Sequence, residues 1–244
     1  MPVRVGITTI GDRPGHWADA ERALGPNVEL LQEPVNLQSM SATGFDEAHQ
    51  RVADAAARLV ERGAVGVMIG GTSFTFYRGV DFHTRLLQRV GAMARVGVSS
   101  TSRAMLDALA ALGARDLAIA TAYTDRVNRK LIEFLVAYGY RVLALRGMDL
   151  DDPAEAERIS PDDTAALARA VFQDAPSADC LLISCGGLRT LDLVVPLESL
   201  TSVPVITSYT VTVWGLAGLA GVAAQPGYGR LLETAPVVST ASAG

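Results

Sequence analysis

Residues 116–126, DLAIATAYTDR, repeat the pattern of residues 3–13, VRVGITTIGDR, near the start of the chain. Each stretch is a short apolar run that reaches a threonine, Thr8 or Thr121, and then an Asp-Arg pair. Apolar runs of this length, bounded by polar residues, are typical of buried strands in parallel sheets. The repeat therefore indicates two copies of one strand-containing unit.

Two further pairs of segments follow in the same order. Residues 65–74, VGVMIGGTSF, correspond to 180–189, CLLISCGGLR, and residues 98–102, VSSTS, correspond to 206–210, ITSYT. One such pair is compatible with the generic similarity of α/β sequences. Three pairs in one order favour a duplicated βαβ half.

Strand-like runs alternate with helical patterns along the whole chain. The expected strands cover residues 3–8, 28–32, 65–69, 95–98, 116–121, 141–145, 179–184 and 203–206. The expected helices include 44–62, 79–92, 102–112, 125–138, 162–173 and about 210–221. This alternation predicts an α/β fold with two pseudo-symmetric βαβ halves, each a parallel four-stranded sheet flanked by helices.

We expect residues 1–112 to form the first half, with the tail 222–244 packed on it, and residues 113–221 to form the second. Ligands of parallel sheets bind beyond the carboxyl ends of the strands. The active site is therefore expected in the cleft between the halves, where four loops would meet. These loops are 8–13, 70–75, 121–126 and 184–188.

Composition restricts the partners of the chain. The 244 residues carry a net charge of −5 with no block of lysine and arginine, so we expect no nucleic-acid partner. No basic-then-apolar segment precedes the first strand, and we expect a cytoplasmic protein without a signal peptide. Residues 199–225 carry no charge, but Pro204 and a cluster of hydroxyl residues favour a strand and a short helix over a membrane span. The sequence leaves the oligomeric state open.

The two cysteines, Cys180 and Cys185, are expected to be thiols. On one extended strand their Cα atoms would be about 16 Å apart, whereas a disulfide needs less than about 7 Å. The histidines, His16, His49 and His83, are scattered and have no ligand-like spacing. We therefore expect no metal site.

The loop at residues 70–75, GGTSFT, follows an expected strand. Glycines followed by Thr72 and Ser73 would expose backbone N–H groups and add hydroxyl donors, a composition that suits a carboxylate or an enediolate. The same residues could also form a polar turn that caps a helix.

The loop at residues 184–188, SCGGL, places the Cys185 thiol beside two glycines that leave space around it. A buried structural cysteine is the alternative, and we expect Cys180 to be one. Tyr123 follows the strand at 116–121, where its hydroxyl could donate into the cleft or its ring could only pack. No Gly-x-Gly-x-x-Gly motif follows a strand and no P-loop is present, so we expect no cofactor.

Four motifs together resemble the aspartate/glutamate/hydantoin racemase (maleate isomerase-like) superfamily and, within it, the arylmalonate decarboxylases. They are GGTSFTFYRG (70–79), ATAYTDRVN (120–128), LLISCGGLRTLD (181–192) and PGYGRL (226–231). Racemases and isomerases of this superfamily have a cysteine in each of two symmetric loops. Here the first-loop position is Gly71, and only Cys185 remains.

The resemblance implies a lyase that removes one carboxylate from a disubstituted aryl- or alkenyl-malonate without a cofactor. A dioxyanion hole would comprise the side chains of Thr72, Ser73 and Tyr123 and the N–H groups of Ser73 and Gly186. The catalytic Cys185 would then protonate the enediolate on one face.

The resemblance also implies an apolar pocket for the departing carboxylate. Its residues would be Ile10, Leu37, Met40, Phe45, Ala156 and Ile159. Family decarboxylases carry a proline at the position of Ile10 and a tyrosine at the position of Phe45. Two other functions therefore stay open: an isomerase or racemase with a second, unrecognised base, and a catalytically silent carboxylate-binding protein.

Overall fold

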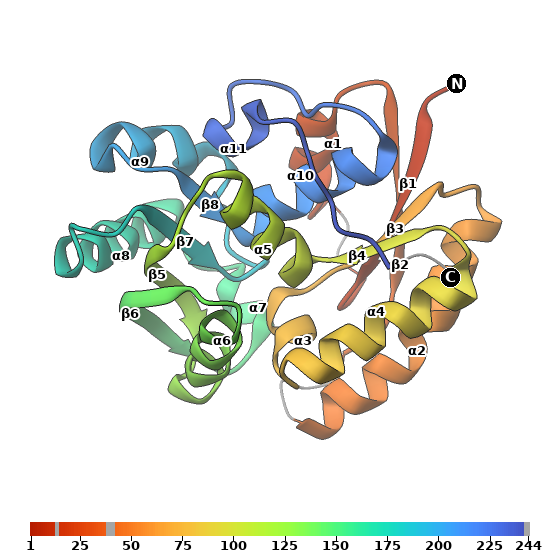
Figure 1. The fold of residues 1–244 in the computed structure, drawn as a ribbon, viewed down its shortest axis with the longest axis horizontal. Helices are drawn as coiled ribbons and strands as arrows, with labels where there is room; N and C mark the ends of the chain where they lie inside the picture. The colour runs from red at the N-terminus through yellow and green to blue at the C-terminus, as the bar shows by residue number, and fades with distance from the viewer. Residues whose placement is uncertain (13–14, 38–41, 242–244) are drawn as a thin grey trace.

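The computed structural model describes residues 1–12, 15–37 and 42–241. Within these ranges it forms two parallel four-stranded sheets, with the orders β2-β1-β3-β4 and β6-β5-β7-β8 (Figure 1). The strands are β1 Val3–Thr9, β2 Val28–Pro34, β3 Gly66–Ile69, β4 Gly97–Ser100, β5 Asp116–Tyr123, β6 Arg141–Leu150, β7 Cys180–Ser184 and β8 Val205–Thr207.

Helices flank both sheets, so the predicted fold class is confirmed. They are α1 Ala18–Leu24, α2 Ala42–Glu61, α3 Thr72–Phe76, α4 Val80–Ala94, α5 Thr101–Ala111, α6 Asp125–Ala137, α7 Pro153–Ala156, α8 Pro161–Asp174, α9 Val194–Thr201, α10 Ser208–Ala220 and α11 Arg230–Glu233, with a 3₁₀ turn at Leu191–Leu193.

The strand pairing reproduces the repeat found in the sequence. Thr8 of β1 pairs with Ile69 of β3, and Thr121 of β5 pairs with Ser184 of β7. Both threonines therefore lie where the neighbouring strand ends and a glycine-rich loop begins. The two loops occupy equivalent positions in the two sheets.

The inner strands of the second sheet, β5 and β7, are buried on both faces, as in a parallel sheet covered by helices. Leu117 and Ile119 of β5 lie in a large core that also contains the first sheet. Ala118 and Ala120 point to the opposite face, where a smaller core includes residues of α8.

Helix α10 lies between the two sheets, close to α5 (Figure 1). It begins two residues earlier than the sequence suggested, because Thr207 and Thr210 form a reciprocal capping box. A Cβ atom on Gly215 would lie 2.5 Å from Cε of Met68 and 3.0 Å from Cβ of Ala104, so the end of the Met68 side chain would have to move if this glycine were replaced. In the described part of the chain, no helix is long and apolar enough to span a membrane.

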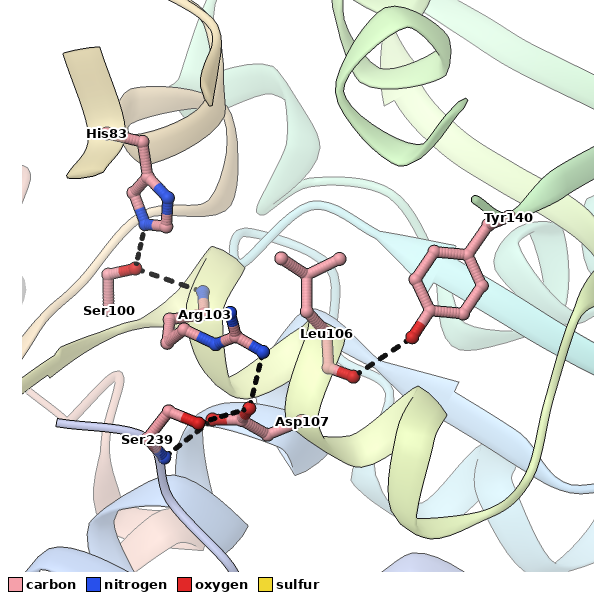
Figure 2. A network of polar contacts seen from close by, with 7 residues as sticks. All are labelled: His83, Ser100, Arg103, Leu106, Asp107, Tyr140 and Ser239. Carbon is pink, nitrogen blue, oxygen red and sulfur yellow. Dashed lines mark hydrogen bonds and ion pairs between the residues drawn. The ribbon is translucent and has the colours of Figure 1, made fainter. Parts of the chain in front are cut away.

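A polar network joins α5 to the C-terminal tail (Figure 2). The backbone N–H and the hydroxyl of Ser239 both donate to the Asp107 carboxylate at 2.9 Å, and Arg103 also pairs with Asp107. The N–H of Ala241 donates to the carbonyl of Val98 on β4 at 3.0 Å. On the other side, the Tyr140 hydroxyl donates to the carbonyl of Leu106 at 3.2 Å.

Helix α5 belongs to the predicted first half, yet it contacts both the C-terminal tail and Tyr140, which lies beyond the predicted boundary at residue 112. Helix α10, which precedes residue 221, packs on β1, β3 and β4 of the first sheet. The division of the chain into 1–112 and 113–221 stays a prediction.

Candidate active site

One cavity lies at the carboxyl ends of strands from both sheets. It holds about 930 Å³ of empty space, counting the solvent at its mouth. Its described lining includes residues of all four predicted loops, among them Gly11, Ser73, Tyr123 and Cys185. The pseudo-symmetric halves thus bring the segments that the sequence singled out to a single cleft.

The first glycine-rich loop has no room for side chains at its two glycines. A Cβ atom on Gly70 would lie 2.3 Å from the carbonyl oxygen of Thr8. Gly71 has φ +95°, and a Cβ atom there would lie 2.9 Å from Cγ2 of Ile10. The position at which the family resemblance predicts a missing second cysteine is therefore restricted here by both backbone conformation and packing.

Thr72 and Ser73 begin the short helix α3 and line the cavity. Both are buried, with 2% and 8% of their surface exposed. The Thr72 hydroxyl donates to the Ser208 hydroxyl oxygen at 2.6 Å, and Ser102 donates to the Thr72 carbonyl at 3.1 Å. These bonds fix the loop against the first residues of α5 and α10.

Tyr123 ends β5, and its hydroxyl lies 3.3 Å from the Ser184 hydroxyl. Burial, together with the nearby Cys185, raises the pKa of Tyr123, although hydrogen bonds with Ser184, Thr72 and Ser73 oppose the shift. The phenol therefore stays protonated near neutral pH and can donate a hydrogen bond to an anion.

Cys185 directly follows β7, is half-buried and packs against both cores. Next to it, a Cβ atom on Gly186 would have no atom within 4 Å, so this loop is open where the first loop is filled. Both cysteines are thiols, as expected. Cys180 is fully buried, and burial raises its pKa, as expected for a structural thiol.

The residues expected in the apolar pocket fall into three groups. Ile10, Leu37 and Ala156 line the cavity. Met40 lies outside the described residues. Phe45 and Ile159 are not among the lining residues.

Phe45 is fully buried behind Phe74, with ring centroids 6.0 Å apart, and stacks obliquely on Tyr77 at 4.8 Å. The ring of Phe45 therefore lies in an aromatic core and is not part of the described lining of the cavity. Ile159 packs against the core between the second sheet and α8.

Several cavity residues were not anticipated from the sequence. His16, Trp17, Ser208 and Tyr209 line one wall, and Leu150, Asp151 and Asp152 line another. Ser208 and Tyr209 follow β8, and the repeat that paired ITSYT with VSSTS was the signal that could have found them. Among the described residues that line the cavity none is a lysine or an arginine, so its donors to an anion are hydroxyl and N–H groups.

Within the described ranges, no three His, Cys, Asp or Glu residues are grouped so that they could hold a metal ion. Hydroxyls, backbone N–H groups and one thiol line the cavity, and these groups suit anion binding and proton transfer; His16, Gln32, Asp151 and Asp152 line it as well.

Comparison with known proteins connects this site to a class. The chain is 35% identical over 218 residues to the arylmalonate decarboxylase of Bordetella bronchiseptica, which covers 88% of this chain and 90% of that protein. A solved glycine-to-cysteine, cysteine-to-serine double mutant of arylmalonate decarboxylase in its liganded form superposes with a TM-score of 0.87 at 33% identity, covering 95% of this chain and 98% of that one.

A maleate isomerase of Pseudomonas putida S16, solved with maleate, superposes with a TM-score of 0.88 at 16% identity, covering 98% of this chain and 99% of that one. The fold and the cleft therefore define an α/β enzyme with the two-sheet architecture of arylmalonate decarboxylases and maleate isomerases.

The model of the arylmalonate decarboxylase family matches residues 14–232, and the chain belongs to this family. It is accordingly an enzyme of the carboxy-lyase kind.

Proposed function

We propose that the protein decarboxylates disubstituted malonates that carry an aryl or alkenyl group and releases a chiral monoacid. One observation carries this proposal: Thr72, Ser73, Tyr123 and Cys185 line the same cavity. Together they offer donors for a carboxylate and one proton source. Membership of the arylmalonate decarboxylase family supports the reaction class.

The carboxylate that remains in the product would bind in a dioxyanion hole. The hydroxyls of Thr72, Ser73 and Tyr123 and the N–H groups of Ser73 and Gly186 would donate to its two oxygens. Since Thr72 donates to Ser208 at 2.6 Å, a bound carboxylate would compete with Ser208 for this proton. The same donors would stabilise the enediolate more strongly, because its oxygens carry more negative charge.

The departing carboxylate would lie against Ile10, Leu37 and Ala156, which line the cavity. Removal of water from a carboxylate costs far more than removal of water from neutral CO₂, so this surrounding favours departure. The C–C bond breaks, CO₂ leaves, and the electron pair of the bond passes into the enediolate. No cofactor is required for this step.

Cys185 would complete the reaction by transferring its S–H proton to the former α-carbon. The thiolate then recovers a proton from water. A single donor protonates one face and gives one enantiomer. Gly71 provides no acid or base on the opposite face, which weighs against a two-base racemase.

The decisive experiment is incubation with phenylmalonate and with 2-methyl-2-phenylmalonate, followed by measurement of CO₂ release and of product chirality. We expect release of CO₂ from both and one enantiomer of 2-phenylpropionate from the second. Isomerisation of maleate without CO₂ release would replace the proposal with an isomerase. Tight carboxylate binding without turnover would replace it with a silent homologue.

A further inference from the structure

Three aromatic side chains form one wall of the cavity, and the proposed reaction assigns them no role. They are His16, Trp17 and Tyr209. Trp17 and Tyr209 stack with ring centroids 5.4 Å apart and planes 18° apart. His16 meets Trp17 edge to face at 5.1 Å. We call this set the aromatic wall.

The aromatic wall is held from two distant segments of the chain. Trp17 precedes α1, whereas Tyr209 is in the first turn of α10, two residues after the N-cap residue Thr207. The Tyr209 hydroxyl donates to the backbone carbonyl of His16 at 3.3 Å. Trp17 and Tyr209 are only 8% and 6% exposed, so their rings have little freedom to rotate away.

The position of Tyr209 relates it directly to the proposed carboxylate site. It follows Ser208, whose hydroxyl oxygen lies 2.6 Å from Oγ1 of Thr72. Tyr209 and Thr72 also line the same cavity, so a substituent on the α-carbon of a carboxylate bound at Thr72 would share that cavity with the aromatic wall. Planar apolar groups gain from contact with buried aromatic rings, both through burial and through ring–ring geometry.

We propose that Tyr209, backed by Trp17, is a specificity-determining residue that holds the aryl substituent of the substrate. This inference rests on the proposed decarboxylation and adds to it the residue that discriminates between substituents. The Tyr209 ring supplies the contact, and the hydroxyl bond to His16 sets the ring orientation.

The test compares kcat/KM for 2-methyl-2-phenylmalonate with kcat/KM for 2-methyl-2-vinylmalonate. In Tyr209→Ala we expect the phenyl-to-vinyl ratio to fall roughly tenfold, because the large ring loses its contact and the small vinyl group loses little. Tyr209→Phe keeps the ring and should keep most of the ratio. Tyr228→Ala is the matched control, since its ring contacts Arg22 outside the cavity, and should leave the ratio at the wild-type value.

One further variant and one binding measurement test the role of Tyr209 independently of the proposed decarboxylation. Tyr209→Leu keeps an apolar side chain without a π-face and leaves a smaller cavity than alanine, so it replaces Tyr209→Ala if that variant fails to fold. Binding of phenylacetate, followed by tryptophan fluorescence, tests the wall without catalysis. Loss of phenylacetate binding in Tyr209→Ala but not in Tyr209→Phe supports the wall, even if the wild-type enzyme releases no CO₂ and the proposed function falls. An unchanged ratio, or an equal loss for both malonates, overturns the inference.

Discussion

The two glycine-rich loops occupy equivalent places in the two sheets but differ in what surrounds them. The first loop packs its glycines against Thr8 and Ile10 and leads into buried hydroxyls at Thr72 and Ser73. The second loop places the half-buried Cys185 beside Gly186, which has open space where a side chain would begin. A duplicated scaffold has thus produced a filled, donor-rich loop and an open loop that carries a thiol. This difference suits a reaction with one binding side and one proton-delivering side.

The largest expected effect comes from removing the thiol of the open loop. We expect Cys185→Ser to lower the rate of CO₂ release from 2-methyl-2-phenylmalonate by about 10²–10⁴-fold, the usual contribution of a positioned acid. Binding of phenylacetate should survive, because the first loop is intact. Cys180→Ala is the control: its thiol is fully buried on β7, so it should lose stability but keep its activity per folded molecule. A fully active Cys185→Ser enzyme would show that the proton comes from elsewhere.

The next largest effect is expected when a hydroxyl donor of the proposed dioxyanion hole is removed. Tyr123→Phe removes one hydroxyl and should lower kcat by about 10²-fold, as loss of one oxyanion donor typically does. Tyr140→Phe removes a hydroxyl that donates to the Leu106 carbonyl outside the cavity, and its kcat should be unchanged. Steady-state kinetics on phenylmalonate would measure both. Equal losses in the two variants would contradict a specific role for Tyr123.

Alanine substitutions at Gly71 and Gly186 compare how tightly the first and the second loop are packed. Gly71→Ala should lower the free energy of unfolding by about 2 kcal/mol, since φ is +95° and the new Cβ atom would lie 2.9 Å from Ile10. Gly186→Ala meets no atom within 4 Å and should stay within about 0.5 kcal/mol of the wild type. Urea unfolding measures both, and similar losses would mean that the loops are equally packed.

Gly71→Cys carries the same strain but adds a thiol on the second face. We expect its folded fraction to racemise 2-arylpropionates slowly, which the wild type should not do. Chiral chromatography of the recovered acid would measure this racemisation. It would show whether a second thiol is sufficient to add racemase activity to the proposed decarboxylase.

The sequence predicted the sheets well because their signal is local. Apolar runs of strand length and the repeat around Thr8 and Thr121 depend only on neighbouring residues, and the strand pairing matches them. The loops at strand ends were predicted for the same reason. The fold class then determined that these loops meet in one cleft.

Side-chain direction could not be predicted in the same way. Phe45 aligns with a pocket residue of the family, yet Phe74 and Tyr77 enclose it in a core whose packing arises from distant segments. Trp17 has no motif of its own, and it lines the cavity while stacked on Tyr209, which comes from a distant segment of the chain. Such placements depend on tertiary contacts, which a single sequence does not display.

The last expected effect is a difference in acid sensitivity between the two loops. His49 supports the first loop by a bond of 2.9 Å between its Nε2 and the Phe74 carbonyl. Burial lowers the pKa of His49 from 6.5 to about 4, against the raising effect of this bond. Burial, followed by Arg103, likewise lowers the pKa of His83 to about 4.

Because the unfolded chain binds these protons near pH 6.5 and the folded chain only near pH 4, stability is complete above pH 6.5 and falls as the pH drops between those values. The loss should reach up to roughly 3 kcal/mol per histidine. Urea unfolding at pH 7, 5.5 and 4.5 should show a smaller decrease in His49→Gln, whose amide can still donate to Phe74. Hydrogen exchange should increase at residues 71–77 before residues 185–188 as the pH falls. An identical pH slope in His49→Gln and the wild type, with equal exchange in both loops, would remove His49 as the cause.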